Sequence, residues 1–516
     1  MAVPRRTAAN PVTYLRAALP ASFGAWFLKE LSVTGAMTLA FPNHAFMIRG
    51  AWMLSVISFE AATSESAASS RSGLSSGSIG DRSLDSGRKQ LMGDTPTTET
   101  VPDYTQARSF WELLLTAAFL GVVGAIAGLV FLGVTGIGSD WYGETGIGWF
   151  DGELWWIAVA AGAGLIVGVL RRVFAMPAKV PGLIEDLKAE TINTKMVLKI
   201  VAVSGVSLVG GASLGPEVAL GQMGGGAGQY IAERRKLDDD AKKEHALSGM
   251  AGAFGGLFSS PILGSILVLE ISSPPRSRSG STFFGTIVAS SVAFGLYFAI
   301  AGSVFLDLYE VPQYDYETWN LPAGIGFGLL SVVVVLSTLA IGTAAKRLLS
   351  GLKIPALVLP VIGGLLFGLV GWALPLTNFT GTDQLGTVLK NGSALGVALL
   401  VAILIGKMIT FAVGSATGFI GGPIFPILFI GGTAGVLVHQ VFPEIPLALA
   451  FTCMLAAVPG SLVAAPFSLV LLVAILTQVG ALHTAPVIVA VATSFLTISL
   501  VKFAISQRRS AAGASG

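Results

Sequence analysis

The chain has 516 residues, of which 53% are hydrophobic and 12% are charged, and its net charge is +2. Its mean hydropathy of +0.76 is far from that of a soluble globular protein. So small a net charge excludes the broad basic surface of a nucleic-acid-binding protein. The single cysteine, Cys453, excludes an intrachain disulfide and a multi-cysteine metal site. We therefore expect a multi-pass protein of a plasma or inner membrane, with lipid and not nucleic acid as a partner.

The first 106 residues differ in composition from the rest of the chain. Ser, Gly, Thr and charged residues dominate 63–100, so this part buries too little apolar surface to offset the entropy of ordering. The preceding part, 21–62, is apolar in places but has neither a clean membrane span nor a signal-peptide layout. It is either a peripheral helix or an ill-folded extension. We expect 1–106 to be a low-complexity, largely disordered extension.

Apolar stretches separated by short polar joints fill the chain from Trp111 onward. They cover 111–136, 153–174, 196–232, 246–271, 282–305, 321–345, 353–376, 393–440, 447–480 and 485–504. About 20 helical residues cross a hydrocarbon core of roughly 30 Å and satisfy their own backbone groups, so these stretches are predicted to be helical. Two of them, 196–232 and 393–440, are too long for one crossing and contain Gly and Pro clusters. These clusters predict helices that are broken inside the membrane.

The two long stretches resemble each other. An ungapped alignment of 211–228 with 418–435 gives seven identities in 18 positions and places Gly215-Pro216 opposite Gly422-Pro423. A second pattern, A-x-x-x-G-x-L-x-x-x-P, begins at Ala251 and recurs from Ala456. The repeat predicts two transmembrane halves, 107–305 and 306–507, followed by a short tail at 508–516.

The repeated Gly-Pro pairs are typical of helix starts. Glycine allows unusual backbone angles, and proline suits the first turn of a helix. The first amides of a helix have no intrahelical partner and carry a partial positive charge, so they bind anions. Two such starts that met inside the membrane would hold a dehydrated anion without a buried cation. The alternative is that the glycines only permit close helix packing.

From about residue 107 to 505 the chain resembles the ClC family of chloride channels and transporters. The resemblance rests on Lys179-Val180-Pro181 in place of a G-S-G-I-P loop, Leu214-Gly215-Pro216 in place of G-R/K-E-G-P, Gly422 to Pro426 in place of G-x-F-x-P, and Phe258 to Glu270 in place of a helix that ends in E-E. It implies an all-α polytopic fold of two inverted-topology halves with broken helices. It also implies a homodimer with one anion path in each subunit, no cofactor, no metal, no enzymatic activity and, since the chain stops at Gly516, no CBS domains.

Two departures from the family pattern bear on mechanism. The position of the family's gating glutamate holds Leu214, and the position of its second proton-carrying glutamate holds Ile271. Neither side chain carries a proton, so the departures favour passive passage of chloride or a similar small monovalent anion. Glu217 lies three residues past the gate position and is interpreted either as a structural acid in a first helical turn or as a displaced, pH-dependent gate. A chloride/proton antiporter gated by Glu217 and an inactive ClC-like scaffold are the alternatives.

The resemblance implies an anion path built from three segments and one isolated residue. The candidate residues are Ala178, Lys179, Val180, Pro181 and Gly182; Ser213, Leu214, Gly215, Pro216 and Glu217; Gly422, Pro423, Ile424 and Phe425; and His483. Lys179 either attracts anions or extends its charge to the membrane interface. His483 or Thr484 would replace a family tyrosine whose own position holds Ala481. Glu185, Asp186 and Lys188 are predicted to be a solvated helix end.

Overall fold

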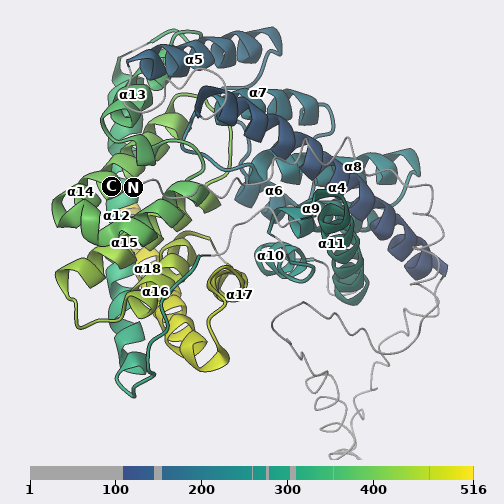
Figure 1. Ribbon diagram of the computed structural model, residues 1–516. Coiled ribbons are helices and arrows are strands. Elements are labelled where there is room, and N and C mark those ends of the chain that lie inside the picture. The colour runs from purple at the N-terminus through teal and green to yellow at the C-terminus, as the bar shows by residue number, and fades with distance from the viewer. Residues whose placement is uncertain are drawn as a thin grey trace, which may run out of the picture. The chain divides into compact units, whose positions relative to one another are not determined.

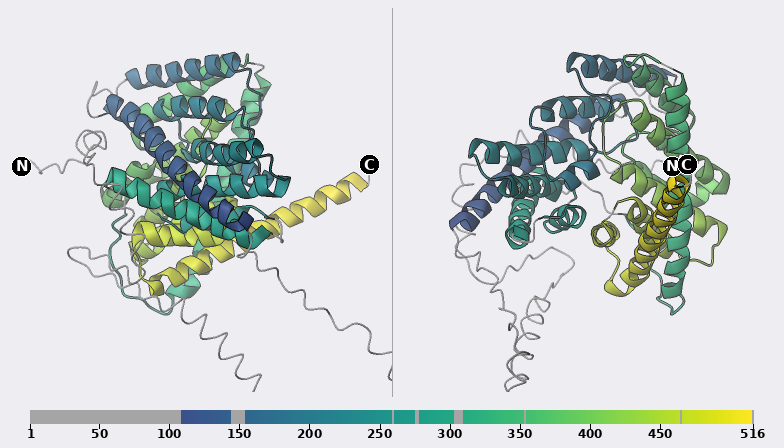
Figure 2. Two further views of the ribbon diagram at one scale, coloured as in Figure 1. Left: turned by 90° about the vertical axis from the view of Figure 1, so that its right-hand side faces the viewer. Right: turned by 180° about the vertical axis from the view of Figure 1, so that it is seen from behind.

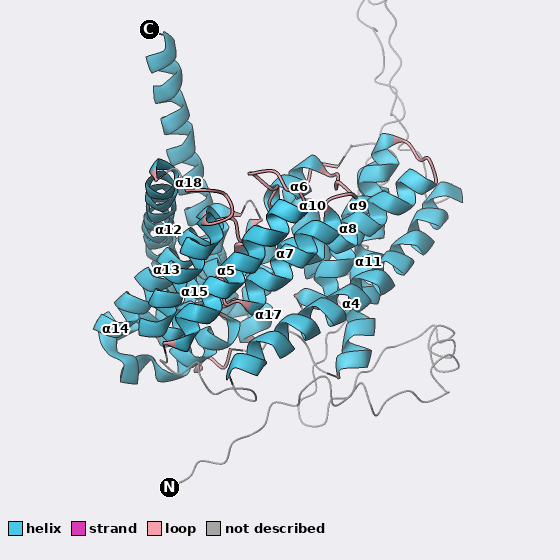
Figure 3. Cartoon of the chain, turned by 90° about the horizontal axis from the view of Figure 1, so that it is seen from above, coloured by secondary structure: helices cyan, strands magenta, loops and turns pink. Residues whose placement is uncertain are grey.

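The computed structural model describes residues 108–143, 154–258, 260–274, 278–302, 309–352, 354–463 and 465–514. The extension expected at 1–106 lies outside these residues. The described residues form helices joined by loops (Figure 3). The β-structure among them is confined to one isolated bridge.

The helices fall into two consecutive sets. The first set is α4 (Arg108–Gly143), α5 (Trp155–Val173), α6 (Leu183–Ala189), α7 (Val197–Val209), α8 (Glu217–Arg234), α9 (Asp239–Leu257), α10 (Leu263–Ile271) and α11 (Ser279–Ala301). The second set is α12 (Asn320–Gly351), α13 (Leu359–Ala373), the short 3-10 helix η3 (Pro375–Thr377), α14 (Thr382–Ala416), α15 (Ile424–Val441), α16 (Leu447–Leu462), α17 (Pro466–Thr477) and α18 (Ala481–Ala514). Helix α18 extends past the other helices toward the C terminus (Figure 2).

Seven helices in the described part of the chain are long and apolar enough to cross a membrane. They are α4, α5, α11, α12, α14, α15 and α18. Large apolar side chains on these helices point outward, as Leu115 on α4 and Leu500 on α18 do. In water this exposure would be unfavourable, whereas in a bilayer it matches the surrounding hydrocarbon. The chain is an integral, multi-pass membrane protein.

Both stretches that were predicted to break are broken. Residues 210–216 separate α7 from α8, and residues 417–423 separate α14 from α15. Each break contains a glycine in the left-handed region, Gly211 with φ +80° and Gly418 with φ +96°. A side chain at either position would be strained, so glycine is required there. The two glycines occupy equivalent positions in the repeat, which confirms the register predicted from the sequence.

Two further apolar stretches, for which no break was predicted, are also divided. The stretch 246–271 contains the end of α9 and all of α10, and 447–480 contains α16 and α17. Pro261 lies between the first pair of helices, and Pro466 begins the second helix of the other pair. Proline lacks the N–H that a continuous helix needs at that point, which accounts for both breaks.

Glycines bring the two sets of helices into close contact at α5 and α13 (Figure 1). A Cβ atom added to Gly164 would clash with the carbonyl of Pro360, and one added to Gly364 would clash with the carbonyl of Ala160. Helices in lipid associate by such close packing of small residues. Part of the high glycine content is therefore structural, as the alternative interpretation of the sequence proposed.

Candidate functional site

The two Gly-Pro breaks meet at Gly215 and Gly422. The amide of Gly215 donates to the carbonyl of Gly422 at 2.7 Å, and the amide of Gly422 donates to the carbonyl of Gly215 at 2.6 Å. The pair is antiparallel, so the two breaks run in opposite directions where they touch. Each of these two amides therefore donates to the carbonyl of the other residue, and neither is free to bind an ion.

Each break is also held by a residue from the opposite half. The carbonyl of Gly211 accepts from the amide of Phe379 at 3.0 Å. At the equivalent position, the carbonyl of Gly418 accepts from Nη1 of Arg171 at 3.1 Å. The hydroxyl of Ser207 accepts from the amide of Ile420 at 3.1 Å. These bonds join the halves around the junction of Gly215 and Gly422.

Glu217 is the first residue of α8, and its side chain crosses the junction to the start of α15. Its Oε1 accepts from the amide of Phe425 at 3.1 Å, and the residue is fully buried. Its Oε2 has no hydrogen-bond partner among the described residues. A Cβ added to Gly215 or Gly422 would clash with this carboxylate, so the two glycines make room for it. The start of α15 thus binds a carboxyl side chain of the protein itself, at the position where free helix-start amides would bind an anion.

The surroundings of the Glu217 carboxylate are buried. Leu214, the predicted gate position, is 2% exposed and packs beside Gly421. Ser213 is fully buried, and its hydroxyl has no partner among the described residues. The ring of Phe425 stacks on that of Phe258 at a centroid distance of 6.1 Å. None of the ion pairs in the described residues includes Glu217.

A cavity of about 720 Å³ reaches the junction from one side. Its lining includes all of Ala178 to Glu185 and the residues Val218, Gly421 and Pro423 beside the junction. Arg171 shapes this cavity, which we call the vestibule, because its Nη2 donates to the carbonyls of Pro177 at 2.9 Å and Ala178 at 3.1 Å. The same guanidinium binds Gly418, so it fixes the first loop against the second break.

Lys179 in the vestibule is paired with an acid. Its Nζ lies 2.8 Å from Oε1 of Glu185, and the side chains are 83% and 52% exposed. The hydrogen bond from Lys179 and that from the amide of Gly182 lower the pKa of Glu185. Lys179 is therefore an exposed, partly neutralised charge in the vestibule.

The predicted solvated end at Glu185, Asp186 and Lys188 is only partly correct. Glu185 and Lys188 are exposed, but Asp186 is buried and accepts from Nε2 of Gln222 at 2.6 Å. Burial raises the pKa of Asp186 to about 6, against the opposing effect of the hydrogen bond from Gln222. Helix α6, which carries Asp186, lies outside the seven candidate spans.

The structure brings three of the four predicted groups together. Residues Ala178 to Gly182 line the vestibule, while Ser213 to Glu217 and Gly422 to Phe425 form the junction. His483 lies in a different cavity of about 600 Å³. Its Nε2 is 3.0 Å from the carbonyl of Tyr314, and the two rings are in edge contact at 4.6 Å.

Sequence reasoning missed two basic residues at this site and the role of one acid. Arg171, near the end of the apolar stretch 153–174, was not among the predicted site residues. Lys407, in the middle of an apolar run, is fully buried and donates to the carbonyls of Asn378 at 3.1 Å and Phe379 at 2.8 Å. An ionisable residue inside a membrane helix is rare, and that rarity could have identified Lys407 from the sequence.

Glu270 accepts from the amides of Phe467 and Ser468, at 2.7 and 2.9 Å, and so caps α17.

The described residues contain no group of three or more His, Cys, Asp or Glu side chains that could hold a metal ion.

Comparison with known proteins gives a consistent result. The sequence profile of a family described as "Voltage gated chloride channel" matches residues 162–499. Proteins named "Putative ion-transport protein YfeO" from Escherichia coli O17:K52:H18 and Shigella flexneri are 24% identical over 359 residues, which is 68% of this chain and 84% of theirs.

Solved structures also match the fold. A slow cyanobacterial Cl⁻/H⁺ antiporter gives a TM-score of 0.61 at 19% identity, covering 75% of this chain and 94% of that one. A CLC-type fluoride/proton antiporter gives 0.61 at 19% identity, covering 74% and 94%. A eukaryotic CLC transporter gives 0.59 at 16% identity, covering 76% and 72%.

Proposed function

We propose that this chain, which belongs to the voltage-gated chloride channel family, carries chloride or a similar small monovalent anion across its membrane through the junction of α8 and α15. The observation that carries the proposal is the hydrogen bond from the amide of Phe425 to the carboxylate of Glu217. A site that holds a buried carboxylate on helix-start amides offers a halide the same donors.

The vestibule supplies the approach to this site. Three basic side chains line it, those of Arg171, Lys179 and Lys346, and Glu185 is the one acid in its lining. A cleft with an excess of one charge raises the local concentration of the opposite ion. The vestibule therefore concentrates anions beside Val218 and Pro423, next to the junction.

Glu217 is the gate in this proposal. An anion and the carboxylate compete for the amide of Phe425, so the side chain must leave before an anion binds there. Protonation removes the negative charge that the helix starts attract, so it favours release of the side chain. The gate is thus an acid displaced by three residues from the position that Leu214 holds.

We favour proton-gated passive passage over stoichiometric exchange. Exchange needs a relay of ionisable groups, and Leu214 and Ile271 provide none at the two family positions. Exchange is the second candidate, because Glu217 is an acid at the junction and two solved proteins of the same fold are antiporters. An inactive scaffold would transport nothing.

We also propose that the chain works as a homodimer, which crosslinking in liposomes followed by gel analysis would test.

Simultaneous measurement of chloride and protons distinguishes these functions. Purified protein in chloride-loaded liposomes is monitored with a chloride electrode and a pH electrode. We expect chloride release that accelerates as the pH falls, without a proportional proton flux. A fixed ratio of protons to chloride would establish exchange, and no release at any pH would overturn the proposal.

Two variants make the experiment specific to the gate. Glu217→Gln removes the carboxylate charge and should release chloride at a rate that is independent of pH. Glu112→Gln is the matched control, because Glu112 is an exposed acid on α4 that pairs with Arg108 at 2.9 Å.

A further inference from the structure

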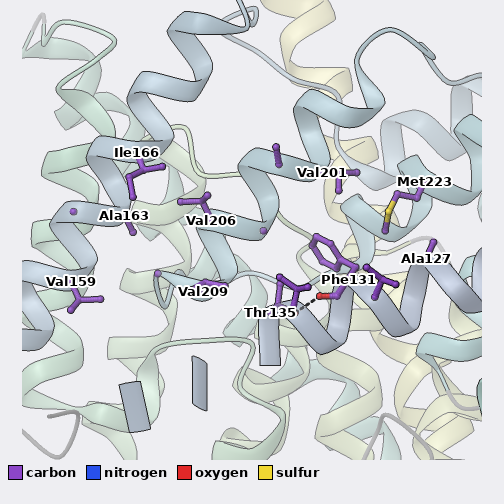
Figure 4. Close-up of a pocket in the computed structure, with 16 residues that line it drawn as sticks. Ala127, Phe131, Thr135, Val159, Ala163, Ile166, Val201, Val206, Val209 and Met223 are labelled. Carbon is purple, nitrogen blue, oxygen red and sulfur yellow. Dashed lines mark hydrogen bonds between the residues drawn. The ribbon is translucent and has the colours of Figure 1, made fainter. Parts of the chain in front are cut away.

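A second cavity, of about 710 Å³, lies between α4, α5 and α7 and reaches α8 (Figure 4). We call it the apolar cavity. Its lining includes Val130, Phe131, Thr135, Ile166, Gly205 and Met223. It shares no lining residue with the vestibule.

The side chains that line the cavity are almost all apolar. Thr135 has the one polar side chain in it, and its hydroxyl already donates to the carbonyl of Phe131 at 2.9 Å. A cavity needs polar partners to hold water, whereas an apolar cavity stays dry and accepts hydrocarbon. No charged side chain lines the cavity, so it matches the hydrocarbon part of a ligand and not a headgroup.

The cavity is continuous with the surface that faces lipid. Val130, Val134 and Ile166 at its rim are 61%, 62% and 50% exposed, and they belong to the candidate spans α4 and α5. Deeper in, Phe131 and Ala163 are 7% and 8% exposed. The lining therefore runs from the bilayer surface into the protein. Its inner part includes Met223, which lies on the same helix as Glu217.

Two glycines keep the cavity open. A Cβ added to Gly162 would meet nothing within 4 Å, and one added to Gly205 would meet only the ring of Phe131, at 3.7 Å. The volume lies within the range of about 300–1,000 Å³ that is typical of ligand sites. We propose that the apolar cavity is a binding site for one acyl chain of a bilayer phospholipid, which enters between α4 and α5 and packs against Met223.

Photolabelling of the full chain in liposomes tests this proposal. The probe is a phosphatidylcholine that carries a diazirine in one acyl chain, and adducts are located by mass spectrometry of peptides. We expect adducts on Met223 and on the α7 lining as well as on lipid-facing residues such as Leu329 of α12. Adducts confined to the rim and to other exposed surfaces would overturn the proposal, because they would indicate ordinary contact with the bilayer.

A pair of glycine variants makes the test specific. Gly162→Phe fills the cavity, so the adduct on Met223 should be lost while that on Leu329 is unchanged. Gly326→Phe is the control, because Gly326 is an exposed glycine of the span α12 whose added Cβ also meets nothing within 4 Å. It should leave the Met223 adduct intact. Persistence of that adduct in Gly162→Phe, or its loss in both variants, would contradict the proposal.

A second measurement does not depend on a variant that folds. Electron cryo-microscopy of the wild-type protein in lipid nanodiscs should show tubular density that runs from Val130 to Met223. An empty cavity in a map that resolves lipids elsewhere on the surface would overturn the proposal, and so would compact density without a chain that leads to the bilayer.

Discussion

The backbone N–H of Phe425 donates to Oε1 of Glu217 at 3.1 Å, so the first turn of α15 binds the acid that begins α8. The two residues lie 208 positions apart and belong to the two halves of the repeat. The hydrogen bond therefore closes the junction that the paired Gly215 and Gly422 create. It also gives the junction one ionisable group whose removal can be tested.

Gly215→Ala should destabilise the protein, because the added Cβ would clash with the carboxylate of Glu217. The three atoms nearest to that Cβ all belong to this carboxylate. Overpacking of this kind costs about 1–3 kcal/mol. Thermal unfolding in detergent measures it. Because the clash involves one side chain, Gly215→Ala combined with Glu217→Ala should recover most of the loss, and a purely additive double variant would contradict this explanation.

Glu185→Gln and Lys179→Ala should have opposite effects on chloride flux. The first leaves Arg171, Lys179 and Lys346 unopposed in the vestibule, while the second leaves Glu185 without its partner. At an ionic strength of about 0.01 M, where screening extends to about 30 Å, we expect flux to rise severalfold in the first variant and fall severalfold in the second. The difference should vanish near 1 M salt, where screening acts within about 3 Å. Equal flux in both variants at low salt would show that the vestibule charge does not act on the anion.

The repeat allowed the centre of this site to be predicted from the sequence. The Gly-Pro pairs predicted that α8 and α15 begin at broken helices, and the alignment placed Gly215 opposite Gly422, which the structure confirms. The local sequence pattern was sufficient to predict these breaks, because a helix break depends on glycine and proline residues close to it in the chain.

The remaining features depend on tertiary packing. Spacing along the chain could not indicate that the Glu217 side chain crosses to Phe425 or that Arg171 reaches Gly418, 247 positions away. Asp186 is buried because Gln222 of α8 packs over it, and an exposed helix end has the same sequence pattern. The contacts of Lys407 also depend on tertiary packing, because the carbonyls that accept from it belong to Asn378 and Phe379, in a separate turn of the chain.

Asp186→Asn should stabilise the protein at high pH and have little effect at low pH. Burial raises the pKa of Asp186 from 3.8 to about 6. Protonation of Asp186 therefore favours the folded state below pH 4, and this contribution is lost as the pH rises through 6. Asparagine is neutral throughout and can still accept from Gln222, so above pH 7 we expect a gain of at most about 3 kcal/mol. Unfolding temperatures in detergent at pH 4 and pH 8 check this, and an equal change at both would contradict it.

Lys407→Met should destabilise the turn that positions Gly211. Nζ of Lys407 donates to the carbonyls of Asn378 and Phe379, and the amide of Phe379 donates to the carbonyl of Gly211. A buried carbonyl left without a donor costs about 1–3 kcal/mol. The control is Lys390→Met, since Lys390 is exposed on the same helix, α14. Unfolding in detergent should separate the two variants, and equal stability would show that Lys407 does not hold the turn.

The most direct test of the anion site is anomalous diffraction from crystals of Glu217→Gln grown in bromide. We expect a bromide peak within hydrogen-bond distance of the amide of Phe425 in the variant. We expect no such peak in the wild-type protein at high pH, where the carboxylate occupies that amide. A variant structure with bromide bound elsewhere and none at the start of α15 would contradict the proposal that an anion passes through this junction.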